Sequence, residues 1–355
     1  MIMNMPVVEN KSVLWNIDNK VYSELTYIND VDNIASTYSV CYLKDILYYD
    51  DKIYVAIAAD KNAYLYMNGG SGWERLAQVT TNNYVDESAS RINLLGFKGQ
   101  IIISVNPYTA SYVSGLYKYA DEKVTALKTQ GGSNGTRATC SVCKTEDGEK
   151  LYWLVQTVGT ASGTKDTTYS FYPYKYDGTT LTSISHSVSA MASQHNYGAM
   201  VFDGKLYVLM YSGNTSNDYY RIFDISNDTF TYMTNISTNF FHSINSSYNK
   251  NGKVYCLGDA YYDIYEIATS VTTPNPLCTD ILYMTPYDDN TLLVVPRFEA
   301  TKIKKLKLYK IATSYATKGT KILSNNSFAI SDNLQATDDG YIVTESGEVK
   351  IGIYE

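Results

Sequence analysis

The sequence has few histidines, tryptophans and prolines for its length. Its 355 residues include 3 His, 3 Trp and 7 Pro, and 18% are charged. Three histidines leave little material for a His-built metal centre. With so few prolines and only 22 Gly, the composition excludes a collagen or a linker-like protein. The net charge of −7 argues against nucleic-acid backbone binding as the main role. No long uncharged apolar run is present, so we expect no membrane insertion.

Targeting and redox signals are also scarce. The first residues, MIMNMP, lack the cationic and apolar stretches of a signal peptide, so none is expected. An odd number of cysteines in a chain of this length predicts buried free thiols and not a disulfide framework. Cys140 and Cys143 form a C-x-x-C, but residues three apart on a strand face opposite ways. We therefore expect no metal and no cofactor. The cysteines are Cys41, Cys140, Cys143, Cys256 and Cys278.

Tyrosine is the abundant residue, with 36 copies against 9 Phe. Tyrosine favours strands, where the ring packs and the hydroxyl reaches water or a backbone group. The sequence also repeats one unit about every 48 residues: an apolar strand, a polar turn, an aliphatic strand, a loop, a Tyr-rich strand and a Thr-rich strand. Its copies begin at YYDDKIYVAIAA, GFKGQIIISVN, EDGEKLYWLVQ, VFDGKLYVLMYSG, KNGKVYCLGDA, DDNTLLVVP and DDGYIVTES.

A four-stranded unit of this period is typical of a β-propeller, in which radially stacked sheets bury one another's faces. Two β-sandwiches would show no fixed period, and a TIM barrel would need helical periodicity between strands. We therefore expect one all-β domain over residues 1–355, a seven-bladed propeller. The expected blades span 39–79, 91–130, 137–188, 196–237, 241–278 and 280–324, and the seventh continues over 327–355.

The last copy is incomplete, and the first residues contain a further strand pair. Residues 12–28 read as two strands around an Asp-Asn turn. We expect this segment to complete the seventh blade, because pairing the chain ends removes an open sheet edge. A separate surface hairpin is the alternative.

The best copy, DGKLYV followed by a small-residue pair and YRIFDISNDTFTYM, resembles a kelch repeat. The kelch diglycine is represented by Ser212-Gly213 or Leu257-Gly258, and the kelch Trp only by Trp73. The resemblance covers roughly residues 36–355 and implies a divergent kelch-like propeller. Kelch-like folds serve sugar oxidases, mutarotases, ligase adaptors and viral attachment proteins. The family also implies that binding uses the face bearing the loops after the second and fourth strands.

On that face, several first strands open with polar side chains. Arginine forks recognise carboxylates, and aromatic rings suit sugars. The sequence therefore predicts a pocket for an acidic or hydroxyl-rich glycan; the alternative is that these residues cap strand ends through local hydrogen bonds. The ligand-binding candidates are Arg91, Arg137, His195, Asn196, His242, Tyr108 and Tyr261.

Catalytic motifs are missing: there is no G-x-S-x-G and no H-E-x-x-H. Acidic pairs such as Asp50-Asp51 occur where hairpin turns are expected, so we interpret them as turn residues. We expect no catalytic residues, and an enzyme is the alternative.

Three functions remain after the motifs have been considered. The first is a non-enzymatic binding or structural propeller of a phage or phage-tail-like particle. Made in the cytoplasm, it would attach to a cell-surface glycan or decorate the tail or baseplate through other virion proteins. The alternatives are a carbohydrate-active kelch-like enzyme and an intracellular interaction scaffold. Few charges and many Tyr, Asn, Ser and Thr favour the first.

Overall fold

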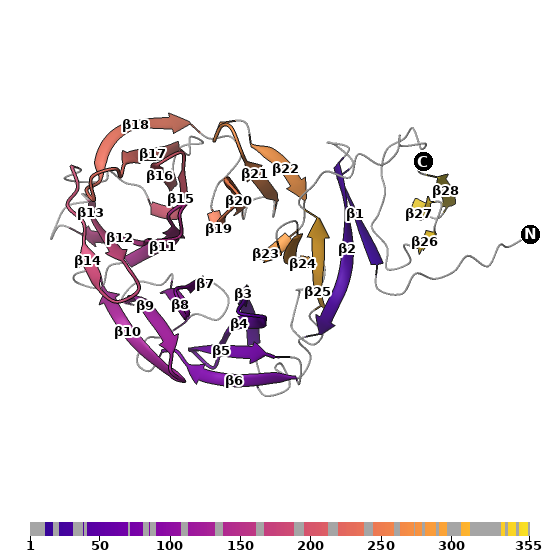
Figure 1. Ribbon diagram of the computed structural model, residues 1–355, viewed down its shortest axis with the longest axis horizontal. Coiled ribbons are helices and arrows are strands. Elements are labelled where there is room, and N and C mark those ends of the chain that lie inside the picture. The colour runs from indigo at the N-terminus through magenta and orange to yellow at the C-terminus, as the bar shows by residue number, and fades with distance from the viewer. Residues whose placement is uncertain are drawn as a thin grey trace, which may run out of the picture.

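The computed structural model consists of antiparallel strands joined by turns and loops, with no helix among the residues that it describes (Figure 1). The described residues are 11–16, 21–30, 38, 41–69, 72–80, 85, 90–107, 113–131, 138–160, 167–187, 195–211, 219–237, 244–258, 263–272, 274–278, 281–288, 291–296, 307–312, 335–337, 340–345 and 348–353.

Five consecutive sheets have four strands each, and chain order runs from the inner to the outer strand of each sheet. This arrangement makes the fold a β-propeller and each sheet a blade. The strands are β3 (Cys41–Tyr49), β4 (Lys52–Ala59), β5 (Asn62–Asn68) and β6 (Trp73–Gln78); β7 (Arg91–Phe97), β8 (Gln100–Asn106), β9 (Ser114–Ala120) and β10 (Lys123–Gln130); β11 (Ala138–Lys144), β12 (Leu151–Thr160), β13 (Thr167–Tyr176) and β14 (Leu181–Ser183); β15 (His195–Phe202), β16 (Lys205–Tyr211), β17 (Tyr219–Asp224) and β18 (Thr231–Ser237); and β19 (Ile244–Lys250), β20 (Lys253–Gly258), β21 (Ile264–Ile267) and β22 (Asn275–Cys278).

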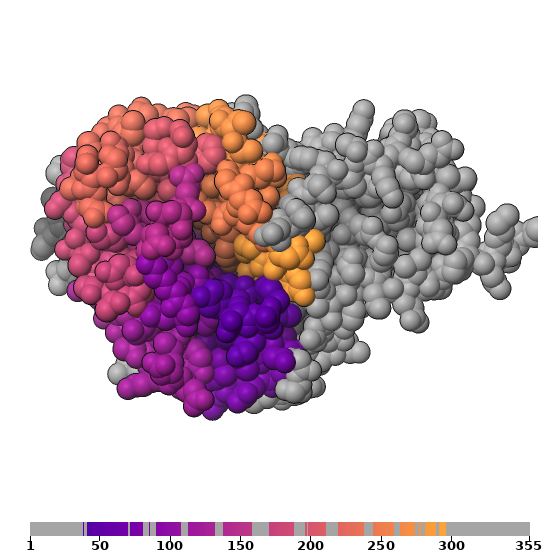
Figure 2. Space-filling view, in the orientation of Figure 1, coloured from indigo at the N-terminus to yellow at the C-terminus, as the bar shows by residue number. Residues whose placement is uncertain are grey.

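A sixth sheet closes the ring and joins distant parts of the chain. It has the order β1-β2-β25-β24-β23, with β23 (Ile281–Asp288), β24 (Thr291–Pro296), β25 (Lys307–Ala312), β2 (Val21–Asp30) and β1 (Lys11–Asn16). Its inner strand β23 contacts β19 of the fifth blade and β3 of the first. The blades therefore follow one another around a common axis, as the colour order shows (Figure 2).

The expectation of seven blades is wrong for the part of the chain described: five four-stranded blades are present, and the ring closes at the sixth sheet. The N-terminal strand β2 pairs with β25, with Tyr27 opposite Tyr309, and not with the C-terminal residues. The C-terminal strands β26 (Gln335–Thr337), β27 (Gly340–Glu345) and β28 (Glu348–Ile353) form a separate sheet. The physical reason is that β23 already contacts β3, so no gap remains for a seventh sheet.

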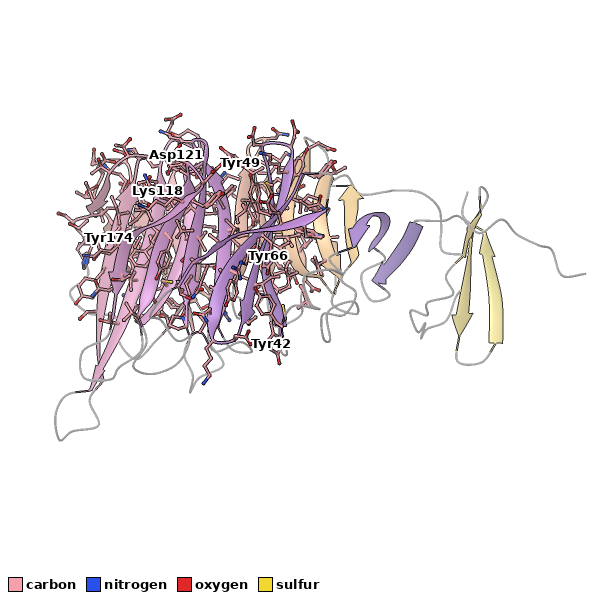
Figure 3. The ribbon with its side chains drawn as sticks, turned by 90° about the horizontal axis from the view of Figure 1, so that it is seen from below. Tyr42, Tyr49, Tyr66, Lys118, Asp121 and Tyr174 are labelled. Carbon is pink, nitrogen blue, oxygen red and sulfur yellow. The ribbon has the colours of Figure 1, made fainter. Side chains whose placement is uncertain are left out.

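The two faces of the ring differ in their connections. The connections from the first strand to the second and from the third to the fourth lie on one side of the ring, which we call the short-turn face. The first-to-second connection has two residues in the first, second, fourth and fifth blades. Figure 3 shows Tyr49 and Asp121 near this face and Tyr42 at the opposite end. Asp50 and Asp51 both have positive φ, 52° and 56°, as two-residue hairpin turns require. Asp50 and Asp51 are therefore turn residues, as the sequence predicted. The opposite side, where the innermost strands begin, is the loop face.

Tyrosine and glycine fit together where the first two blades meet. A Cβ placed on Gly96 would lie 2.0 Å from the Tyr49 ring, so only glycine fits there. The Tyr49 hydroxyl accepts a hydrogen bond from Gly99 N at 2.8 Å. Between the third and fourth blades, Phe171 stacks on Phe223 with ring centroids 5.9 Å apart. Aromatic rings therefore pack between adjacent blades at both of these contacts.

Candidate functional site

The innermost strand of each blade turns one edge towards the axis, where no further strand pairs with it. Backbone groups on such an edge need other partners. Side chains from neighbouring blades provide them: Asp45 Oδ2 accepts a hydrogen bond from Leu94 N at 2.8 Å. On the other side of the axis, Ser247 Oγ donates to Ala199 O at 2.8 Å. Polar side chains of the inner strands therefore connect neighbouring blades through hydrogen bonds.

Several inner strands also carry a bulge near their loop-face ends. The register shifts between Leu43 and Asp45 in β3, between Asn196 and Gly198 in β15, and between Ile244 and Ser246 in β19. A bulge bends the strand and re-aims its side chains. At Gly198, which has a φ of 154°, a Cβ would lie 2.4 Å from Ile244 Cβ. The absence of a side chain there lets the fourth and fifth blades approach closely beside the axis.

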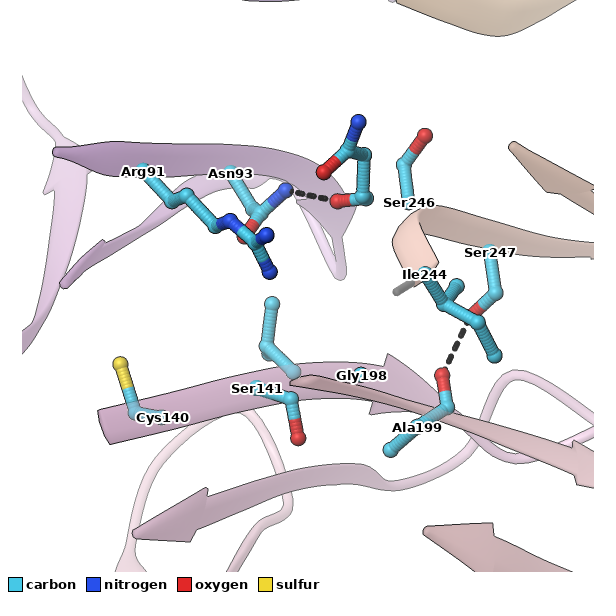
Figure 4. A pocket seen from close by; sticks show the side chains of 11 residues that line it. Arg91, Asn93, Cys140, Ser141, Gly198, Ala199, Ile244, Ser246 and Ser247 are labelled. Atoms are coloured by element: carbon cyan, nitrogen blue, oxygen red, sulfur yellow. Dashed lines mark hydrogen bonds between the residues drawn. The ribbon is translucent and has the colours of Figure 1, made fainter. Parts of the chain in front are cut away.

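A small pocket, which we call the channel-mouth pocket, lies beside the axis between the first residues of β7 and β19 and the middle of β11 and β15 (Figure 4). Its enclosed space is about 10 Å³, which is room for about one water molecule. Only a single functional group of a larger ligand fits inside. The lining residues are Arg91, Asn93, Cys140, Ser141, Val142, Gly198, Ala199, Ile244, Asn245, Ser246 and Ser247.

The polar side chains of this channel-mouth pocket are one guanidinium, which only donates hydrogen bonds, and amides and hydroxyls, which both donate and accept them. Arg91, partly exposed at the start of β7, extends into the space between the strands (Figure 4). Asn93 Nδ2 donates to Asn245 O across the axis. The buried Ser246 Oγ has no hydrogen-bond partner in the described part of the chain. A guanidinium in a pocket that also has amide and hydroxyl groups is suited to an anionic or hydroxyl-rich group.

A buried carboxyl and a buried phenol lie behind the pocket. Asp45 is 1% exposed, and its two oxygens accept hydrogen bonds from Ile46 N at 2.9 Å and Leu94 N at 2.8 Å. Burial raises the pKa of the Asp45 carboxyl well above its usual value, against the opposing effect of these hydrogen bonds. Burial, followed by the nearby Asp45 charge, raises the pKa of Tyr248, which is 3% exposed. Both groups are stabilised in their neutral forms and are shielded from solvent.

The structure brings two of the sequence-predicted residues to this region. Arg91 lines the pocket. Asn196 is buried beside it: its Oδ1 accepts from Ser141 Oγ at 3.0 Å and its Nδ2 donates to Leu154 O at 3.1 Å. The amide of Asn196 therefore joins the fourth blade to the third through hydrogen bonds. His195 begins β15, but its side chain lies outside the described residues. Arg137, His242, Tyr108 and Tyr261 lie outside them altogether.

Sequence reasoning missed Asp45, Asn93 and Ser246. Asp45 and Asn93 each have apolar neighbours in the first strands CYLKDILYY and RINLLGF. Ser246 lies in the largely polar first strand INSSYNK. A polar residue at a core position needs a hydrogen-bond partner. A polar residue between apolar neighbours was therefore the feature of the sequence that could have indicated a role at the axis.

The expectation of buried free thiols is confirmed for Cys140, Cys143 and Cys256, whereas Cys41 is free but only partly buried. Cys140 packs with Ser104 of the second blade, whereas Cys143 lies in a core cluster with residues of the fourth. Burial raises the pKa values of Cys140, Cys143 and Cys256. Within the described ranges no group of three or more His, Cys, Asp or Glu side chains is placed to hold a metal. The same ranges contain no helix suited to crossing a membrane.

Neither a protein-family model nor a curated protein matches the chain. Solved structures that resemble it include an endosialidase of phage phi92, with a TM-score of 0.47 and 8% identity over 93% of this chain and 74% of that one. A puromycin-hydrolysing peptidase of Mycobacterium tuberculosis has a TM-score of 0.45 and 10% identity over 92% and 54%. A PL25 ulvan lyase has a TM-score of 0.43 and 9% identity over 76% and 78%. With identities this low and TM-scores below 0.5, none of these likenesses bears on the site. The sheets themselves identify the β-propeller.

Proposed function

We propose that this protein is a non-enzymatic, divergent kelch-like binding propeller that holds an acidic or hydroxyl-rich glycan at the loop-face mouth of its channel. The observation that carries the proposal is the channel-mouth pocket. Its described lining includes a guanidinium, two side-chain amides and three serine hydroxyls, and no carboxylate. The guanidinium of Arg91 is the group of this lining best suited to a carboxylate, a sulfate or a sugar hydroxyl. The hydroxyls of Ser141 and Ser247 already donate to Asn196 Oδ1 and Ala199 O and can only accept from a ligand.

The size of the pocket limits how the ligand binds. With room for about one water molecule, it accepts one functional group while the rest of the glycan lies on the loop face. Arg137, His242, Tyr108 and Tyr261 belong to segments next to the loop-face ends of the strands, and their contribution stays a prediction. A sugar ring lying across this face would contact aromatic side chains there.

The burial of Asp45 and Tyr248 favours binding over catalysis. A glycan-cleaving enzyme of the common kind positions carboxyl groups against the sugar. Asp45 is 1% exposed and both of its oxygens are held by backbone N–H groups. Tyr248 is equally inaccessible. Asp45 and Tyr248 therefore support the ring and do not reach a ligand.

We further propose that the protein is a component of a phage or phage-tail-like particle, with a cell-surface glycan or other virion proteins as its partners. The support is compositional: 36 Tyr, few charges and a net charge of −7. Such a surface suits glycan contact through rings and hydroxyls and does not suit binding to nucleic acid.

A glycan array probed with the wild type, Arg91→Ala and Arg75→Ala tests this proposal. Arg75 is an exposed arginine on the outer strand β6 and serves as the matched control. We expect the wild type and Arg75→Ala to bind the same acidic or hydroxyl-rich glycans. Loss of a charge-assisted contact should weaken Arg91→Ala by about 1.5–3 kcal/mol, or more than tenfold. Absence of glycan binding by the wild type, or equal binding by all three proteins, would contradict the proposal.

A further inference from the structure

Two serine hydroxyls that line the channel-mouth pocket already serve as donors within the molecule. Ser141 Oγ donates to Asn196 Oδ1 at 3.0 Å, and Ser247 Oγ donates to Ala199 O at 2.8 Å. Both serines are buried, with 6% and 4% of their surface exposed. A hydroxyl has one hydrogen, so each of these oxygens can only accept a hydrogen bond from a ligand. Towards the pocket, the two hydroxyls therefore act as acceptors.

Asn93 adds a third acceptor to the lining. Its Nδ2 donates to Asn245 O on the fifth blade, and Figure 4 shows the amide nitrogen directed at that carbonyl and the amide oxygen turned away from it. The oxygen of an amide accepts hydrogen bonds and does not donate them. The side-chain groups of the lining that can donate are the Arg91 guanidinium, the Asn245 amide and the Ser246 hydroxyl. The pocket therefore combines donors with acceptors.

The size of the pocket decides which functional group matches this mixed lining. The enclosed space is about 10 Å³, room for one group of the size of a water molecule. A carboxylate or sulfate oxygen only accepts hydrogen bonds, so inside the pocket it would meet the three acceptors without a hydrogen to donate. A hydroxyl is as small as a water molecule and both donates and accepts. It therefore makes the hydrogen bonds that a water molecule would make there, and binding it costs no polar contact.

We propose that the channel-mouth pocket binds a hydroxyl of a sugar acid, and that the carboxylate of the same sugar lies outside the pocket against Arg91. This inference rests on the proposed glycan binding and narrows its ligand to a uronic acid or a similar hydroxy acid. Arg91 starts β7 on the loop face, is partly exposed, and extends its guanidinium into the space between the strands (Figure 4). Its forked N–H groups match the two oxygens of a carboxylate.

A saturation-transfer NMR titration of the full chain at pH 7 with three ionised acids tests the proposal. The first, 3-hydroxypropanoate, carries a hydroxyl and a carboxylate at the spacing found in a uronic acid. Propanoate lacks the hydroxyl, and 3-fluoropropanoate replaces it by a fluorine of similar size that does not donate. We expect 3-hydroxypropanoate to bind about two- to tenfold more tightly than either of the others, which is the contribution of one hydrogen bond.

Serine variants locate this preference in the pocket. Ser141→Ala removes one acceptor of the lining, so we expect it to bind 3-hydroxypropanoate more weakly and propanoate as the wild type does. The matched control is Ser114→Ala, because Ser114 is also buried and donates to Ala138 O at 3.0 Å, but it does not line the pocket. Each variant loses one buried hydrogen bond, so the two melting temperatures should fall by similar amounts. Only Ser141→Ala should lose the preference, and Arg91→Ala should bind all three acids more weakly.

Equal affinity of the wild type for the three acids, with weaker binding by Arg91→Ala, would overturn this inference and leave the proposed function standing, because the pocket would then take the carboxylate. A preference for 3-hydroxypropanoate that Ser141→Ala retains would also overturn it. A wild type that binds none of the acids would do the same, whereas the proposed function fails only if the glycan array shows no binding that depends on Arg91.

Discussion

At the inner edge of the ring, side chains form hydrogen bonds with backbone groups of the innermost strands that are not paired with another strand. Asp45 is the most demanding case, because its carboxyl is buried and yet accepts hydrogen bonds from Ile46 N and Leu94 N. An asparagine has the same shape but only one acceptor oxygen, so it would place an N–H₂ group against a backbone donor. Asp45 is therefore needed to join the first blade to the second.

The raised pKa of Asp45 gives this residue a signature in the pH dependence of stability. The folded state keeps the Asp45 proton to higher pH than the unfolded chain does. Stability contributed by Asp45 is therefore fully present below the unfolded pKa, about 4, and is lost as pH rises through the folded pKa.

We expect Asp45→Asn to lower the free energy of unfolding by about 1–3 kcal/mol at pH 4, because one backbone donor loses its acceptor. The difference from the wild type should shrink towards pH 7, because only the wild type loses stability through Asp45. Urea unfolding of both proteins at a series of pH values measures this difference. A difference that grows with pH would mean that the buried carboxylate is stabilised by its charge.

At the scale of strands, the sequence resolved local pairings better than distant ones. The hairpin at Asp50-Asp51 was predictable because two-residue turns need residues that tolerate positive φ. The opposed faces of Cys140 and Cys143 follow from strand alternation. The pairing of β2 with β25 joins residues almost 300 positions apart, with Leu25 opposite Ile311. Nothing in the local pattern distinguishes β25 from a C-terminal strand as the partner of β2.

Removal of residues 1–30 tests the role of β2. The deletion exposes β25 and leaves the sixth sheet with three strands, so we expect the free energy of unfolding to fall by at least about 2 kcal/mol, more than surface changes usually cost. Deletion of residues 331–355 is the matched control, because β26–β28 form a separate sheet. It should leave the main thermal transition in place. Equal effects of the two deletions would contradict this closure of the ring.

At the scale of the whole molecule, the repeat predicted the propeller but not the number of blades. Each blade shows its own alternation and turns, so a period of about 48 residues was visible without a structure. The last repeat also forms a hairpin, with Thr337 opposite Gly340, but in a sheet of its own. A turn signal is local, whereas ring closure depends on how β23 meets β3.

The sequence likewise predicted the local features of the site but not the contacts that depend on ring closure. Arg91 was predictable because it opens a first strand on the loop face. Asn93 and Ser246 become neighbours only when opposite blades meet at the axis, where Asn93 bonds the backbone of Asn245. One sequence without an alignment does not indicate which polar residues of an apolar strand converge there. The pocket is therefore a property of the closed ring and not of any single blade.

The most direct test of the central claim measures affinity and stability on the same protein. For a glycan identified on the array, calorimetric titration and thermal unfolding of the wild type and Arg91→Ala separate ligand binding from a structural role. If Arg91 holds the ligand at the channel mouth, affinity falls by more than tenfold while stability changes by less than about 0.5 kcal/mol. Unchanged affinity with a clear loss of stability would contradict the account, because Arg91 would then support the ring and not bind a glycan.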